Sequence, residues 1–211
     1  MEWPKRARTA DWENGVLTLD REKKFETPEL TAEIMERLAR YTLVGFHVKG
    51  CPVTDELLAP FAGHKSMVNF GVEDGALTDA CFPVFSAMPK LRYLLLDGNA
   101  AIHGSGLPAL QGCKLDLLTL NRTGWMMPVC SRRASIPKLS HIQIDHTAVT
   151  YEGLLAIAGN NRIEPVAICN SPRSRWNTSP SSSGKRPKIP SSWISRRWKN
   201  AAGCCPLSLL R

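Results

Sequence analysis

The hydrophobic positions of this chain recur with a fixed step of 24 residues. The clearest unit is residues 139–162, LSHIQIDHTAVTYEGLLAIAGNNR, in which apolar residues alternate with polar ones before a bend and an apolar second half. A single unit of this size cannot bury its own apolar face, so the repetition predicts units that stack on one another. Equivalent units begin at Leu43, Met67, Leu91 and Leu115, and Ile163 follows at the same step.

Each unit is predicted to form one short strand and one short helix. Polar residues that suit a helix start open the second half at Thr54-Asp55, Thr78-Asp79 and Thr150-Tyr151. Parallel strands must be joined by crossovers, which predicts an α/β fold with a curved sheet inside and helices outside. The inward strand positions are Leu43, Phe46, Val48; Met67, Phe70, Val72; Leu91, Leu94, Leu96; Leu115, Leu118, Leu120; Leu139, Ile142 and Ile144. A further apolar position falls at Val53, Leu77, Ala101, Trp125 and Val149.

Residues 1–42 are predicted to form an N-terminal strand–helix cap. Residues 1–13 resemble an irregular lead-in, and residues 15–20, GVLTLD, alternate as a strand does. Thr27 and Pro28 then suit a helix start, with Thr27 as the N-cap. This strand and helix are longer than one repeat, so we expect them to cover the open end of the stack.

The strand segments share a pattern, LxxLxLxxNxL, of which residues 91–99, LRYLLLDGN, are the closest match. This pattern resembles that of the leucine-rich repeat family, whose asparagine bonds the turn backbone. Other units carry Cys51, Gly75, Thr123 and Thr147 at that position, as in the cysteine-containing and ribonuclease-inhibitor-like subclasses. The resemblance covers residues 43–168 and implies a leucine-rich-repeat solenoid, a short horseshoe with parallel strands on its concave face. It also implies a scaffold that binds proteins or peptides.

Side chains between the inward positions are expected to point to the concave face. Exposed Tyr, Arg and His on rigid strands are typical of a binding site, although a solvated sheet face would carry polar residues too. Five to six strands offer only about 400 Å², half of what a standard partner covers, so we expect contact at the following turns as well. The candidate residues are His47, Lys49, Asn69, Glu73, Asp74, Tyr93, Asp97, Thr119, Asn121, Arg122, His141, Gln143, Asp145 and His146.

The sequence favours no catalytic, cofactor or metal site. His141, Asp145 and His146 are too widely spaced on a strand to converge easily, and no third ligand lies in register. Cys81 and Cys113 fall in the helical halves, where cysteine packs as a small apolar residue. No glycine-rich phosphate loop follows a strand. We therefore predict a chain that is not an enzyme and needs no cofactor.

The positive charge of the chain is confined to its C-terminal end. The chain has a net charge of +8, but residues 167–211 contain nine Lys and Arg and no Asp or Glu, so the rest is near neutral. This Ser- and Pro-rich stretch, residues 169–211, is predicted to be a disordered tail. Its basic residues and tryptophans also allow an alternative function, nucleic-acid binding. A salt-dependent gel shift with and without residues 169–211 separates the two functions.

Cysteine use and hydropathy predict a location in the cytoplasm. Seven scattered cysteines include no CxxC pair, which favours a reducing compartment over a disulfide framework. No apolar run approaches the roughly 20 residues that span a bilayer, and no apolar stretch follows the basic start as in a secretory signal.

Two stretches that break the repeat, residues 125–133 and 169–211, are candidates for shifted reading frames. Residues 125–128, WMMP, require the codons TGG ATG ATG CCN, which read Asp-Asp-Ala after the first residue when read one nucleotide earlier. The shifted text LDDAGL matches VTYEGL at residues 149–154. The same shift forces acidic residues at Asn177, Ile194 and Lys199. The alternative is a native sequence that matches by coincidence, and the coding DNA decides between them.

The C-terminal end of the stack is predicted to be weak. Residues 163–168 supply one last strand, but no amphipathic helix follows to cover the core. Repeat arrays need a polar cap for solubility, so we expect early hydrogen exchange in residues 150–168 and self-association through this end.

Overall fold

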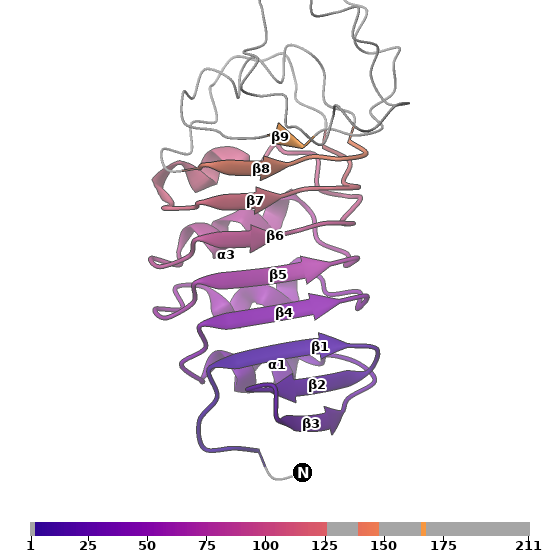
Figure 1. The fold of residues 1–211 in the computed structure, drawn as a ribbon, viewed down its shortest axis with the longest axis vertical. Coiled ribbons are helices and arrows are strands. Elements are labelled where there is room, and N and C mark those ends of the chain that lie inside the picture. Colours follow the sequence, from indigo (N-terminus) through magenta and orange to yellow (C-terminus); the bar gives the residue numbers. More distant parts are fainter. Residues whose placement is uncertain (1–2, 126–138, 148–165, 168–211) are drawn as a thin grey trace, which may run out of the picture.

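A computed structural model describes residues 3–125, 139–147 and 166–167. Within them the chain is α/β, with one nine-stranded sheet in the order β3-β2-β1-β4-β5-β6-β7-β8-β9 (Figure 1). Strands β4 to β9 pair in parallel, β1 is parallel to β4, and β2 is antiparallel to both β1 and β3. The strands are β1 Thr9–Glu13, β2 Val16–Leu19, β3 Lys23–Glu26, β4 Gly45–Lys49, β5 Asn69–Glu73, β6 Tyr93–Leu95, β7 Leu117–Thr119, β8 His141–Gln143 and β9 Val166–Ala167.

The register of the sheet follows the sequence period. Phe46 pairs with Phe70, Phe70 with Leu94, Leu94 with Leu118 and Leu118 with Ile142, so neighbouring strands are offset by one 24-residue unit. Every predicted inward strand position is buried, which confirms the strand pattern. Strand β9 lies inside the predicted last strand at residues 163–168.

Aromatic rings fill the core behind β4 and β5. The Phe70 ring centroid lies 5.0 Å from that of Phe46, 5.5 Å from that of Phe61 and 5.2 Å from that of Phe85. All four rings are buried. Tilted and edge-on arrangements at these distances add to the stabilisation that burial alone provides. The two strands with the largest buried rings are also five residues long, whereas β6 to β8 have three residues each.

Short helical segments cover one face of the sheet, which we call the back face (Figure 1). Two of them begin at predicted caps: Thr78 accepts a hydrogen bond from the Ala80 N–H at 3.1 Å, and Thr54 is an N-cap without a side-chain bond. One predicted core position is wrong, because Ala101 is exposed and Ile102 is buried in its place. The segments are α2 Asp55–Leu58, η1 Ala59–Phe61, η2 Asp79–Cys81, α3 Phe82–Ser86 and η3 Leu107–Gly112.

The N-terminal region contains more structure than the sequence pattern predicts. Residues 9–13 form strand β1 rather than an irregular lead-in, and the Trp12 indole donates to the Thr27 carbonyl at 2.8 Å. Thr27 is not a helix cap, because its side-chain hydroxyl accepts no hydrogen bond from a following N–H. Helix α1, Ala32–Ala39, begins instead after Thr31, whose hydroxyl accepts from the Ile34 N–H at 3.4 Å.

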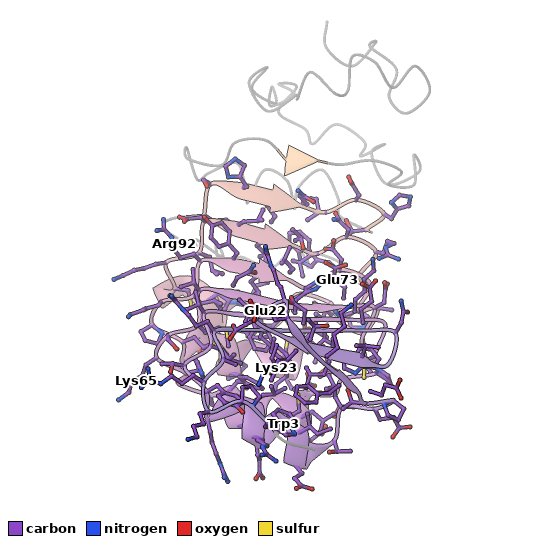
Figure 2. The ribbon with its side chains drawn as sticks, turned by 60° about the horizontal axis from the view of Figure 1, so that its bottom comes forward. Trp3, Glu22, Lys23, Lys65, Glu73 and Arg92 are labelled. Atoms are coloured by element: carbon purple, nitrogen blue, oxygen red, sulfur yellow. The ribbon has the colours of Figure 1, made fainter. Side chains whose placement is uncertain are left out.

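A stacked aromatic group closes the N-terminal end of the sheet. The Trp3 ring lies 5.6 Å from that of Phe25 and 6.4 Å from that of Tyr41, both nearly parallel to it. The Arg37 guanidinium lies 4.6 Å from the Trp3 ring centroid, as in a cation–π contact. Figure 2 shows Trp3 at this end of the molecule, away from Glu73 and Arg92. The cap therefore consists of strands β1 to β3, helix α1 and this ring stack.

Buried polar side chains secure the turn in the three units that carry Asn99, Thr123 and Thr147. The Asn99 amide donates to the Val72 and Leu96 carbonyls at 2.8 and 2.9 Å and accepts from the Leu77 N–H at 3.1 Å. At the equivalent position of the next unit, the Thr123 hydroxyl donates to the carbonyl three residues earlier at 2.8 Å. Thr147 makes the same bond to Ile144. These bonds satisfy carbonyls that leave the sheet, as buried backbone groups require.

The residue at one fixed position after the strand is left-handed in every described unit. Gly50 and Gly98 have φ values of 70° and 76°, and glycine adopts this region without steric cost. Asp74, Arg122 and His146 occupy the same position with φ values of 53°, 56° and 57°. Left-handed Asp and His are several-fold enriched over other side chains, whereas Arg has no such preference.

Several sequence predictions lie outside the described residues. They concern the predicted helix start at Thr150-Tyr151, the apolar position at Val149, the anomalous stretch after Trp125 and the basic tail at residues 169–211. The reading-frame hypothesis and the predicted weak C-terminal end also stay predictions.

Candidate functional site

The candidate residues project from the face of the sheet opposite the helices, which we call the front face. Strand alternation places the predicted residues His47, Asn69, Tyr93 and His141 on this face, because their neighbours Phe46, Phe70, Leu94 and Ile142 are buried on the other. In Figure 1 this face is toward the viewer and the helices lie behind it. The front face corresponds to the concave face of the sequence analysis.

An apolar patch lies on β6 and β7 of the front face. Tyr93 is paired with Leu117 across β6 and β7, and Leu95 follows on the same face. Tyr93 is 40% exposed and is the large hydrophobic side chain that stands out on the described surface. Leu95 and Leu117 are half-buried. We define Tyr93, Leu95 and Leu117 as the apolar patch.

The sequence analysis missed Leu95 and Leu117. Both are leucines beside inward leucines, and they were assigned to no surface. The signal was nevertheless present, because Leu95 lies between Leu94 and Leu96 and a period of two must turn it to the opposite face. Strand alternation finds these residues, whereas a search for polar side chains does not.

Thr119 corrects a prediction of the sequence analysis. It lies on the front face by alternation and pairs with Leu95, but it is only 2% exposed. Its hydroxyl is buried and has no hydrogen-bond partner in the structure. Burying a hydroxyl without a partner costs about 1–3 kcal/mol. Thr119 therefore forms the floor of the front face beside the apolar patch rather than its exposed surface.

His47 and Glu73 form a half-buried pair beside the patch. The His47 Nε2 atom lies 3.1 Å from a Glu73 carboxylate oxygen. Between them Gly71 has no side chain, and a Cβ there would collide with the His47 ring. Glycine at residue 71 thus leaves room for the imidazole to lie over β5 and to reach Glu73 at the end of that strand.

Polar side chains form a continuous chain along the ends of β6 to β8, which we call the turn edge. The Asp97 carboxylate accepts from the Asn121 N–H and side-chain amide, both at 2.9 Å. The Asn121 oxygen accepts from the Asp145 N–H at 2.7 Å, and its amide donates to Gln143 at 3.3 Å. The structure thus brings four predicted site residues together.

An ion pair crosses the turn edge over a glycine. The Arg122 guanidinium lies 3.0 Å from the Asp74 carboxylate, two units away along the sheet. Gly98 lies between them, and a Cβ at this position would collide with the Asp74 side chain. Both charged side chains are substantially exposed, so the pair itself stabilises the fold by less than about 1 kcal/mol.

The opposite edge of the front face, where the strands begin, carries a second ion pair. Arg92 contacts Asp116 through Nε at 2.6 Å and through Nη2 at 2.5 Å. Next to it, the Ser140 hydroxyl lies 2.8 Å from His141 Nδ1. Figure 2 shows Arg92 and Glu73 at opposite sides of the sheet. The sequence analysis missed Arg92 and Asp116, which precede the strand residues it selected.

The remaining predicted residues lie at the margins of the face. Lys49 is exposed and 4.0 Å from Glu13 of β1, while Asn69 and His146 are exposed. Beyond Lys49 the front face continues over the cap as a shallow hollow of about 370 Å³. The lining residues are Asp11, Glu13, Asn14, Val16, Thr18 and Lys24.

The described residues offer little for catalysis or metal binding. Burial, with the nearby Asp55 and Asp79 carboxylates, raises the pKa of the Cys81 thiol far above its ordinary value, and burial also raises that of Cys113. Such thiols are inert toward substrates. In the part of the chain that the structure describes, no three His, Cys, Asp or Glu side chains are arranged to hold a metal ion. No helix in the same residues is long and apolar enough to cross a bilayer.

Comparison with known proteins adds no assignment to this geometry. No protein-family model matches the sequence, and no curated protein matches it.

Proposed function

We propose that this chain is a non-catalytic leucine-rich-repeat scaffold that binds a protein or peptide on the front face of its sheet. The observation that carries the proposal is the apolar patch, in which an exposed Tyr93 is held beside two half-buried leucines on rigid strands. Binding hot spots have this composition, an aromatic anchor in an apolar surround with a polar rim. The rim here is the turn edge on one side and the Arg92–Asp116 pair on the other.

The size of the face supports the same function. The cap adds β1, β2 and β3 to the sheet in line with the repeats, so the face extends beyond the five to six strands expected from the sequence. Each added strand widens the face by about 4.8 Å. The added strands bring the area of the face closer to the roughly 800 Å² that a standard partner covers.

Nucleic-acid binding through residues 169–211 remains the alternative function. It rests on residues outside the described part of the chain, and no feature of the described surface favours it. The proposed scaffold needs no cofactor, and we expect it in the cytoplasm.

Selection of binding peptides from a random displayed library against the full chain tests the proposal. We expect selected peptides whose dissociation constant rises at least tenfold, about 1.4 kcal/mol, for Tyr93→Ala and rises for His141→Ala. Val84→Ala is the matched control, because Val84 is half-buried on helix α3 behind the sheet. This substitution should leave the affinity unchanged. Peptides that bind equally well to both front-face variants would place the binding site elsewhere.

A further inference from the structure

We infer that the partner is an extended basic peptide, with an apolar side chain on the apolar patch and its Lys or Arg side chains along the turn edge. This inference rests on the proposed function and adds the chemistry of the partner. It comes from the charge of the front face, the buried hydroxyl of Thr119 and the spacing between the patch and the turn edge.

The front face is acidic although the chain as a whole carries +8. Among the described residues its carboxylates outnumber its fixed cations, which are Lys24, Lys49, Arg92 and Arg122. Lys49, Arg92 and Arg122 each lie beside a carboxylate of the same face. A surface with an excess of one charge attracts and orients partners of the opposite charge. The described carboxylates of the front face and its two edges are Asp11, Glu13, Glu26, Glu73, Asp74, Asp97, Asp116 and Asp145.

The Thr119 hydroxyl supplies a hydrogen-bonding group at the floor of the face. It has no partner, although nearly all buried polar groups in proteins have one. Its strand neighbours on this face are the half-buried Leu95 and the exposed Gln143, whose flexible side chain can move aside. An oxygen of the bound peptide that reaches the floor of the face is a suitable acceptor for this hydroxyl.

The positions of the patch and the turn edge define a spacing in the partner. Tyr93 and Asp97 are four residues apart along β6 and its extension, about 13 Å at 3.3 Å per residue. An extended peptide aligned with the strand covers the same length with four of its own residues. The partner should therefore carry an apolar residue and a basic residue at positions i and i+4.

Fluorescence anisotropy with synthetic peptides tests the inference on the full chain. The first probe is a Gly/Ser peptide with Trp at position i and an Arg pair beginning at i+4. The second probe replaces the Arg pair with Glu, and the third replaces Trp with Ala. We expect only the first probe to bind in a Tyr93-dependent way, with an affinity that falls as salt rises.

Substitutions on the protein identify the groups involved. Glu73→Gln and Asp97→Asn keep the shape and an acceptor oxygen, and each should weaken the Trp/Arg probe severalfold. Thr119→Val should weaken it by a smaller factor. Glu36→Gln, an exposed carboxylate on helix α1, is the matched control and should have no effect.

Three outcomes overturn the inference, and they differ in whether front-face binding survives. If the Glu probe binds at least as tightly in a Tyr93-dependent way, the charge assignment is wrong while front-face binding survives. If neither charged probe depends on Tyr93 while library selection yields neutral peptides that do, the partner is not basic. If no selected peptide depends on Tyr93 or His141, the proposed function itself fails.

Discussion

Strands β4 to β8 carry one row of paired residues on the back face of the sheet and one on the front face, and the two rows can be compared. The back row is Phe46, Phe70, Leu94, Leu118 and Ile142. The front row, one residue further along each strand, is His47, Gly71, Leu95, Thr119 and Gln143. Every back residue is apolar and buried, whereas the front row contains a different type of side chain at every step.

The difference between the rows shows that the two faces of one strand are under different structural constraints. Stacking requires that each unit bury its back face against the next, so the same kind of residue recurs every 24 positions. The front face carries no such requirement, so its residues can differ from one unit to the next. Substitutions matched across the two faces can test this separation.

Phe70→Ala should have the largest effect on stability. Its ring contacts those of Phe46, Phe61 and Phe85, and removing it leaves a cavity that lowers the free energy of unfolding by about 3–5 kcal/mol. Tyr93→Ala on the front face should cost about 1 kcal/mol or less, because that ring is exposed. Urea unfolding followed by tryptophan fluorescence measures both. Equal losses would contradict the division between the faces.

Asn99→Ala should have the second largest effect. The substitution removes four hydrogen bonds, the longest of them to the Asp97 carbonyl at 3.4 Å. It leaves the Val72 and Leu96 carbonyls and the Leu77 N–H buried without this partner. We expect a loss of about 3 kcal/mol in the free energy of unfolding. Thr123→Val, the matched control at the equivalent position, removes one bond and should cost about 1 kcal/mol. A smaller cost for Asn99→Ala than for Thr123→Val would contradict this account of the turn.

The 24-residue period was enough to predict the back face. Inward positions such as Phe70 and Leu118 are buried as expected, because stacking imposes the same choice on every unit. The exception at Ala101 is accompanied by a local hydrogen bond. Ile102 replaces Ala101 in the core of the unit that contains Asn99, and the Ile102 N–H bonds to the Asn99 carbonyl.

Strand β1 and the front-face floor could not be predicted in the same way. Trp12 and Ala10 lie in strand β1, which pairs with β2 on one side and with β4 on the other. The pairing with β4 is distant in sequence, and no local period reveals it. Thr119 was assigned to the surface by its polarity, whereas its burial depends on neighbours from β6 and β8. The site therefore depends on contacts between units, which the repeat pattern does not specify.

Thr119→Val should change stability in the opposite direction from Thr123→Val. Valine keeps the β-branched shape and removes a buried hydroxyl that lacks a partner, so the free energy of unfolding should rise by about 1 kcal/mol. The Thr123 hydroxyl is bonded, so the same replacement there should lower it. A loss of stability for Thr119→Val would mean that its hydroxyl is satisfied in solution.

Arg122→Gly should have the smallest effect on stability and a clear effect on binding. Arg122 holds a left-handed conformation that glycine adopts without strain at Gly50 and Gly98. Relief of this strain, about 1 kcal/mol, offsets the loss of the exposed ion pair with Asp74 and the greater flexibility of the unfolded chain. The free energy of unfolding should therefore stay within about 0.5 kcal/mol of the parent value.

The same substitution removes the cation beside Asp74 and should raise the affinity for the Trp/Arg probe severalfold, because a basic partner no longer competes with Arg122. Arg122→Ala is the matched variant, since it also lacks the guanidinium but keeps the left-handed strain. It should bind the probe as tightly as Arg122→Gly and be less stable by about 1 kcal/mol. Anisotropy titrations and urea unfolding on both variants measure the two effects separately. A fall in affinity for both would instead identify Arg122 as a direct contact, with a carboxylate of the partner opposite it.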